Sequence, residues 1–213
     1  MPQLTRFVFW LPSLSIALLF ALPANAAEPA AKSLFDGKTL MGWKTTPFGG
    51  EGEIEVEEGR LLIRSGNPMS GITYTGEFPK TNYEVSLEAM RVSGSDFFCG
   101  LTFPVGENPC SFICGGWGGG VVGLSSIDGS DASENETTKY MEFESNRWYT
   151  IRVRVTPEKI VTWIDKKQMV DLDLKDRRLS IRLEVELSRP LGIATYNTSA
   201  ALREIKVQPL KAQ

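Results

Sequence analysis

The clearest pattern along the chain is a strict alternation of apolar and polar residues over short segments. From Tyr83 to Ala89 every second side chain is apolar, whereas Glu84 and Glu88 lie on the opposite side. Residues 147–155 repeat the pattern. A period of two with one polar face is typical of a half-buried strand in an antiparallel sheet. These two segments therefore predict two strands of such a sheet.

Other short apolar runs, separated by turn residues, extend this prediction to most of the chain. The expected strands are residues 53–63 (a hairpin that turns at Glu57-Glu58-Gly59), 71–74, 83–92, 97–103, 110–116, 121–127, 147–155, 159–164, 168–172, 191–195 and 201–207. No amphipathic helix of three turns is predicted. Many short strands at this spacing indicate an all-β protein, a jelly-roll β-sandwich of two antiparallel sheets.

The first 26 residues are set apart from this pattern. Arg6 precedes an apolar run over residues 7–22, which Pro12 interrupts, and a small-residue site follows at Ala24-Asn25-Ala26. This order is typical of a secretory signal peptide cleaved after Ala26. An uncleaved N-terminal anchor is the alternative, although the apolar run is short for a membrane span. The sequence thus predicts a secreted or periplasmic protein.

Removal of the leader leaves a linker over residues 27–32 and one domain over residues 33–209. No later stretch approaches the roughly 20 apolar residues that cross a bilayer, so no transmembrane segment is expected in the mature chain. Arg6 is the only charge lost, which leaves 22 basic and 26 acidic residues and a net charge of −4. An acidic balance without basic clusters argues against a nucleic-acid partner.

The sequence contains no histidine. A histidine base, a Ser-His-Asp triad and histidine metal ligands are therefore excluded. The three cysteines lack the ligand set and spacing of a zinc site. Neither a metal nor another cofactor is predicted.

Five segments occur in an order that resembles a known family. They read SLFDGKTLMGW, IEVEEGRLLI, TNYEVSLEAMRVSGSDFFCGL, NRWYTIRVRVTPEKIVTWIDKKQMVDL and RPLGIATYNTSAALREIKV. Over residues 33–207 the chain resembles the 3-keto-disaccharide hydrolase domain family. The resemblance implies a concanavalin A-like jelly roll and the cleavage of sugars oxidised to a ketone at C3. The cysteine- and glycine-rich residues 110–120 depart from the more polar segment usual in that family.

This unusual stretch belongs to a predicted hairpin centred on Gly106-Glu107. In that register Phe103 faces Cys110 and Leu101 faces Phe112, while Cys99 faces Cys114. The alternation then places Phe97 and all three cysteines on the core face. Cys99 and Cys114 are predicted to form a disulfide, since cross-strand partners reach the required separation. Three buried free thiols are the alternative.

The opposite face of this hairpin is predicted to carry Asp96, Phe98, Thr102, Ser111, Ile113 and, near its end, Trp117. If it continues the polar face of residues 83–92, carboxylates lie beside an aromatic ring, an arrangement suited to a sugar. Glu88 and Asp96 are then the candidate catalytic acid and base for a substrate whose C3 ketone acidifies the C2 hydrogen. Trp117 is the candidate stacking platform, and Asp128 and Tyr196 are candidate contacts to sugar hydroxyls.

Each of these residues also has a structural interpretation. Glu88 can belong to a solvated strand face, Asp96 can cap the turn before it, and Asp128 can form a turn with the following glycine. Trp117 can be a core ring approached by glycine backbone. The function therefore stays open between a 3-keto-glycoside hydrolase or lyase, a non-catalytic carbohydrate-binding module, and an interaction domain of the cell envelope. The loss of polar residues that are usual in the family, together with the absence of histidine, favours the binding module.

Overall fold

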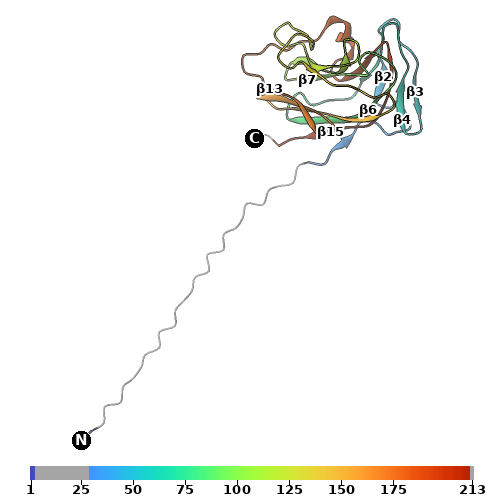
Figure 1. Cartoon of the computed structure of the whole chain (residues 1–213). Coiled ribbons are helices and arrows are strands. Elements are labelled where there is room, and N and C mark those ends of the chain that lie inside the picture. Colours follow the sequence, from blue (N-terminus) through green and yellow to red (C-terminus); the bar gives the residue numbers. More distant parts are fainter. Residues whose placement is uncertain (3–28, 212–213) are drawn as a thin grey trace.

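The computed structural model describes residues 1–2 and 29–211. The predicted signal peptide therefore lies outside the described residues, apart from its first two. Residues 32–209 form two antiparallel sheets that pack face to face (Figure 1). In the described part of the chain, the single helical element is the 3₁₀ turn η1 (Leu183–Ser188). The prediction of an all-β sandwich is confirmed.

The first sheet has eight strands. In spatial order they are β13 (Lys167–Asp173), β12 (Lys159–Ile164), β11 (Trp148–Val155), β6 (Tyr83–Gly94), β15 (Thr198–Pro209), β4 (Arg60–Ile63) and β3 (Ile54–Glu57), with β1 (Lys32–Ser33) beside β15. Lys32, which the sequence assigned to the linker, is thus part of a strand and pairs with Val207. The predicted hairpin of β3 and β4 turns at Glu58 and Gly59, both at positive φ.

The second sheet has seven strands. In spatial order they are β10 (Lys139–Tyr140), β9 (Val121–Ser125), β8 (Asn108–Gly116), β7 (Cys99–Val105), β14 (Gly192–Tyr196), β5 (Met69–Tyr74) and β2 (Trp43–Thr45). The register of β7 and β8 confirms the predicted hairpin, since Phe103 pairs with Cys110 and Cys99 pairs with Cys114. Every residue of β7 is buried, because both faces of this sheet are covered near its centre.

The core lies between the two inner faces. Alternate residues of β6 and β11 point into it, and Tyr83 and Tyr149 are fully buried there. One prediction about this core is wrong. Phe98, not Phe97, enters it, because the alternation of β7 begins only at Cys99 and the chain before it crosses between sheets. Phe98 is fully buried, whereas Phe97 packs on the outer side of the sheet.

Two crossovers between the sheets run side by side and join strands from the middle of each sheet. The chain passes from β6 to β7 through residues 95–98 and from β14 to β15 through Asn197. The Tyr196 backbone N–H donates to the Phe97 carbonyl at 3.1 Å, and the Asp96 N–H donates to Thr198 Oγ1 at 3.1 Å. These two hydrogen bonds hold side by side two segments that lie about 100 positions apart in the sequence.

Candidate functional site

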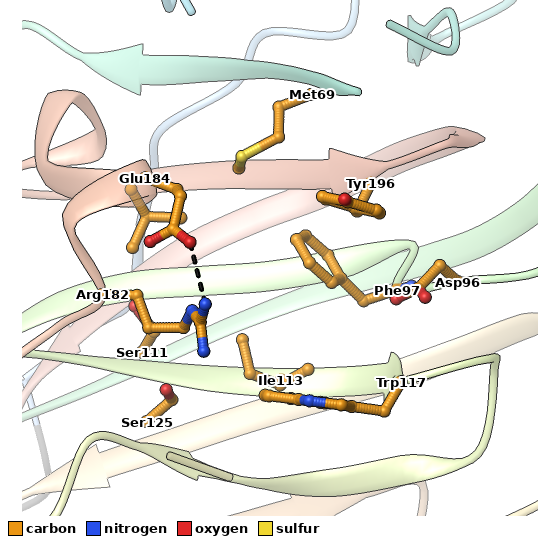
Figure 2. A pocket seen from close by; sticks show the side chains of 11 residues that line it. Met69, Asp96, Phe97, Ser111, Ile113, Trp117, Ser125, Arg182, Glu184 and Tyr196 are labelled. Atoms are coloured by element: carbon orange, nitrogen blue, oxygen red, sulfur yellow. Dashed lines mark hydrogen bonds and ion pairs between the residues drawn. The ribbon is translucent and has the colours of Figure 1, made fainter. Parts of the chain in front are cut away.

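A cavity of about 300 Å³ opens on the outer face of the seven-stranded sheet, beside these crossovers (Figure 2). It combines acidic, basic, hydroxyl and aromatic side chains from three parts of the chain. The lining residues are Met69, Asp96, Phe97, Ser111, Ile113, Trp117, Ser125, Arg182, Glu184, Val185 and Tyr196. A concave site with a few polar groups among apolar ones is the usual form of a small-molecule site.

The floor of the cavity comes from β8 and β9. Ser111, Ile113 and Ser125 face outward because they alternate with the core residues of these strands. Ser111 Oγ lies 2.8 Å from Thr102 Oγ1, and Ser125 Oγ lies 3.4 Å from Ser126 Oγ. The floor therefore offers hydroxyl groups held in place by their neighbours.

Asp96 stands at one end of the cavity, in the crossover between β6 and β7. Its Oδ1 accepts a hydrogen bond from the Phe97 backbone N–H at 2.7 Å, and its Oδ2 accepts one from the Gly118 N–H at 3.0 Å. Among the residues that the structure describes, no cationic side chain forms an ion pair with this carboxylate. Asp96 is thus oriented by backbone dipoles alone, and each oxygen keeps acceptor capacity for a ligand.

Trp117 lies in the loop between β8 and β9. Its φ is +48°, and the flanking Gly115 and Gly119 also have positive φ, a conformation that glycine adopts at little cost. This tight loop leaves the indole 43% exposed, with one side against the cavity. The interpretation of Trp117 as a core ring is therefore wrong, and the ring is available for stacking.

Tyr196 closes the same end of the cavity. Its ring lies 5.8 Å from that of Phe97, with 39° between the ring planes. Figure 2 shows both rings next to Asp96 and across the cavity from the 3₁₀ turn. An aromatic wall and a phenolic hydroxyl thus accompany the carboxylate.

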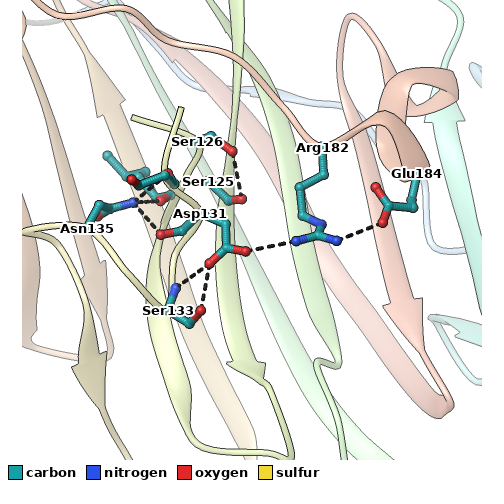
Figure 3. Close-up of polar contacts among 9 residues, drawn as sticks. Ser125, Ser126, Asp131, Ser133, Asn135, Arg182 and Glu184 are labelled. Atoms are coloured by element: carbon teal, nitrogen blue, oxygen red, sulfur yellow. Dashed lines mark hydrogen bonds and ion pairs between the residues drawn. The ribbon is translucent and has the colours of Figure 1, made fainter. Parts of the chain in front are cut away.

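Arg182 and Glu184 form the opposite end, at the start of η1 (Figures 2 and 3). The Arg182 guanidinium bridges two carboxylates, with Nη1 at 2.8 Å from Asp131 Oδ2 and Nη2 at 2.8 Å from Glu184 Oε1. The hydrogen bond from Arg182 lowers the pKa of Glu184. Burial would raise the pKa of Asp131, but hydrogen bonds from Ser133 and the charge of Arg182 outweigh it and lower that pKa.

The loop that carries Asp131 is itself held by side-chain hydrogen bonds. Asn135 Nδ2 donates to the carbonyls of Leu124, Ser130 and Asp131, at 2.8, 3.1 and 2.7 Å (Figure 3). Ser126 and Ser180 exchange backbone hydrogen bonds of 2.6 and 3.1 Å, which anchors the chain just before Arg182. The charged end of the cavity is consequently built on fixed backbone.

The structure brings together three of the five predicted site residues, namely Asp96, Trp117 and Tyr196. Glu88 is elsewhere, because β6 belongs to the eight-stranded sheet and its polar side faces away from the cavity. There Glu88 forms an ion pair with Arg203. The predicted continuity between the polar faces of residues 83–92 and 97–103 is therefore wrong: the chain changes sheets between them.

Asp128 also lies outside the cavity. Its Oδ1 accepts from the Arg178 N–H, and its Oδ2 forms an ion pair with Arg177, both at 2.8 Å. These contacts, the backbone hydrogen bond first, lower the pKa of Asp128. With φ of +52° and a following glycine, Asp128 forms the turn that was its structural alternative.

The three cysteines are buried on the inner face of the sheet that carries the cavity. Cys99 and Cys114 are direct cross-strand partners, as predicted, but all three are free thiols and the predicted disulfide is not formed. Burial raises the pKa of Cys110 to about 12. The alternative of three buried thiols describes the structure.

Sequence reasoning missed Arg182 and Glu184. They belong to residues 175–189, which show no strand periodicity and no known motif. The one signal in this segment is its density of arginine and glutamate between two predicted strands. Such a charge pattern does not reveal that η1 packs on β5, where the Leu187 carbonyl accepts from Thr73 Oγ1 at 2.9 Å.

The described residues contain no group of three or more Cys, Asp or Glu side chains arranged to hold a metal ion. None of the helices among them is long and apolar enough to cross a membrane.

Comparisons with known proteins place this geometry in a family. Similar solved structures include the carbohydrate-binding module CBM66 from Bacillus subtilis, with a TM-score of 0.54 and 12% identity over 78% of this chain and 95% of that one. A putative glycosyl hydrolase from Parabacteroides distasonis has a TM-score of 0.53 and 11% identity, over 85% and 94% of the chains. The Crh5 transglycosylase in complex with NAG has a TM-score of 0.57 and 10% identity, over 88% and 86%.

At these identities the likeness concerns the fold, a jelly roll that binding modules and glycoside-active enzymes share. A search of curated protein sequences found no match. A family model, described as the 3-keto-alpha-glucoside-1,2-lyase-like domain, matches residues 30–208 and so covers nearly all of the sandwich. The resemblance found in the sequence is confirmed, and the chain belongs to the family of 3-keto-α-glucoside-1,2-lyase-like domains.

Proposed function

We propose that the protein cleaves the glycosidic bond of 3-keto-glycosides in the cavity of the seven-stranded sheet. The observation that carries the proposal is the meeting of Asp96, Trp117 and Tyr196 in one cavity. Membership of the family adds the substrate class, sugars with a ketone at C3. The cavity is of a size that holds one or two sugar rings, with the Trp117 indole as a stacking surface.

The chemistry follows from the ketone. A carbonyl at C3 acidifies the hydrogen on C2, so that a carboxylate suffices as base. When the base takes this proton, the C–H electron pair forms a double bond between C1 and C2, and the C1–O bond breaks. The departing oxygen takes up a proton. Addition of water to the double bond completes a net hydrolysis.

Asp96 is the base in this proposal, because both of its oxygens retain acceptor capacity and none of the described cationic side chains forms an ion pair with it. Tyr196 supplies the hydroxyl that protonates the departing oxygen. Arg182 provides a cationic donor for the negative charge that develops on the C3 oxygen during proton removal. Glu184 and Asp131 hold the guanidinium in place.

The proposal is tested with a chromogenic 3-keto-glucoside and the corresponding unoxidised glucoside. We expect release of the chromophore from the keto compound alone. Deuterium at C2 is expected to slow the release, because the C2–H bond breaks in the elimination. Release at equal rates from both glucosides would contradict the proposal, as would release that is insensitive to C2 deuteration and leaves no trace of the unsaturated product.

A carbohydrate-binding module without catalysis is the second candidate. It is favoured by the two backbone hydrogen bonds to Asp96, which hold the carboxylate as a fixed acceptor for sugar hydroxyls. In this case neither glucoside is cleaved, but both quench tryptophan fluorescence. Neither cleavage nor quenching would favour the third interpretation, an interaction domain of the cell envelope.

We further propose that the protein is exported, to the periplasm or the medium, after cleavage behind Ala26. The support is the order of Arg6, the apolar run and the small-residue site in the sequence. Mass spectrometry of the protein recovered outside the cytoplasm tests this. The expected mature N-terminus is Ala27, and an intact leader would favour the uncleaved anchor.

A further inference from the structure

Arg91 is a buried arginine that the proposed chemistry does not use. It lies in β6 and is only 7% exposed. Among the described residues, no carboxylate lies within ion-pair distance of its guanidinium. Burial lowers the pKa of Arg91, while the more distant charge of Asp96 opposes this shift. A buried charge without a counter-ion is costly and needs other partners.

The partners are backbone carbonyls from three separate segments. Arg91 Nη2 donates to Asp96 O at 3.2 Å, to Gly119 O at 3.1 Å and to Gly115 O at 3.5 Å. Arg91 Nη1 donates to Phe143 O at 3.5 Å. One guanidinium thus ties the backbone of the candidate base to both ends of the loop that presents Trp117.

Packing around the guanidinium fixes it in this position. Its central carbon lies 5.3 Å from the centre of the Phe98 ring and 5.8 Å from that of Phe143, within cation–π range. Gly115 permits the close approach, because a Cβ atom there would lie 2.5 Å from Arg91 Nη2. The loop is therefore built around this side chain.

We infer that Arg91 is the positioning residue of the cavity, which sets the placement of the Trp117 indole relative to the Asp96 carboxylate. The inference rests on the proposed function for its catalytic consequence, but the structural tie is testable without any ligand. Arg91 does not itself line the cavity, so it acts through the backbone that it holds. Lysine cannot replace it, because an ammonium lacks the planar fork that serves several acceptors at once.

The first experiment measures amide hydrogen exchange in the mature protein without ligand. The reporters are the N–H groups of Gly118 and Gly119, which donate to Asp96 Oδ2 and to Gly116 O. In Arg91→Lys and Arg91→Met we expect exchange of these two amides at least about tenfold faster, with the β6–β11 ladder unchanged. Leu87→Ala is the matched control, because it removes core packing from the same strand without touching the loop.

The outcome of this experiment does not depend on the enzymatic function. Faster exchange confined to the loop supports the tie. Unchanged exchange in both variants overturns it, and so does an equal increase in Leu87→Ala, which would show a general loss of stability. If Arg91→Met does not fold, the comparison of Arg91→Lys with wild type decides.

The second experiment is a double-mutant cycle on the 3-keto-glucoside. We expect Trp117→Ala to raise KM about tenfold in the wild-type background and less than twofold in the Arg91→Lys background, because the indole is already misplaced there. Additive effects would overturn the positioning role even if the exchange result holds. If the wild type cleaves neither glucoside, the proposed function fails separately. The cycle is then run on the Kd measured by fluorescence quenching. If no quenching occurs either, the exchange result alone decides the structural tie.

Discussion

The outer faces of the two sheets carry the same residue types but differ in how arginine is used. On the eight-stranded sheet, Arg203 pairs with Glu88 and lies 4.1 Å above the centre of the Trp148 ring. Arg152 pairs with Glu84 and covers the Trp163 ring at 4.4 Å. Glu84, Glu88 and these two indoles thus each have an arginine partner from a neighbouring strand.

On the seven-stranded sheet, Asp96 is held by backbone N–H groups and Trp117 has no cation stacked on it among the described residues. The alternation of a strand therefore does not distinguish a functional carboxylate from a structural one. What distinguishes them is whether a neighbouring strand supplies an arginine. Among the described residues, this difference leaves the Asp96 carboxylate and the Trp117 ring without side-chain partners, and the sugar site proposed there can be tested by matched substitutions on the two faces.

The largest difference is expected between Asp96 and Glu88, the two carboxylates that the sequence predicted as catalytic. Asp96→Asn should lower kcat on the 3-keto-glucoside by about 10²–10⁴-fold, because the amide cannot accept the C2 proton. Glu88→Gln, on the other sheet, should leave kcat and KM within about twofold. Steady-state kinetics with the chromogenic substrate measure both.

Circular dichroism and the thermal midpoint show whether each variant is folded. The comparison between the faces breaks if Glu88→Gln loses activity while its fold is intact. It also breaks if Asp96→Asn retains full turnover, since the base would then have to be Glu184 or a group outside the described residues.

The second pair of variants compares the two tryptophans. Trp117→Ala should weaken sugar binding about tenfold, since stacking of a ring contributes about 0.5–1.5 kcal/mol beyond the buried area. Trp163→Ala should leave binding unchanged, because its ring is covered by Arg152 and Arg154. Titration with the 3-keto-glucoside, followed by fluorescence or calorimetry, gives both dissociation constants. Equal losses for the two variants would mean that the eight-stranded sheet also binds sugar.

The same comparison shows what the sequence could predict. The strands and the register of β7 and β8 follow from alternation and turn residues, which are local signals. The assignment of Glu88 to the site failed because the change of sheet at residues 95–98 depends on packing between distant strands. Tyr196 was predicted as a contact to a sugar hydroxyl, and it lies in the cavity because its strand ends beside residues 95–98. Arg182 was missed, because nothing in its segment indicates that η1 folds back over β5 and β14.

The third prediction concerns the inner face of the seven-stranded sheet, directly beneath the cavity. Cys99, Cys110 and Cys114 should not react with a thiol reagent at pH 8 in the native protein, because they are buried and burial raises the pKa of Cys110 to about 12. After denaturation without reductant, three thiols should titrate. A count of one would restore the disulfide between Cys99 and Cys114 that the sequence predicted.

The smallest expected effect concerns Asp131, which forms an ion pair with Arg182 at the charged end of the cavity. The folded-state pKa of Asp131 lies below its ordinary value of 3.8, so its charge stabilises the fold above about pH 4, and this contribution is lost as the pH falls through the lowered pKa. Asp131→Asn should therefore reduce the free energy of unfolding by about 1 kcal/mol at pH 6 and by progressively less below pH 4. Urea denaturation at several pH values measures this difference. A pH-independent difference would mean that Asp131 acts through its hydrogen bonds to Ser133 and not through its charge.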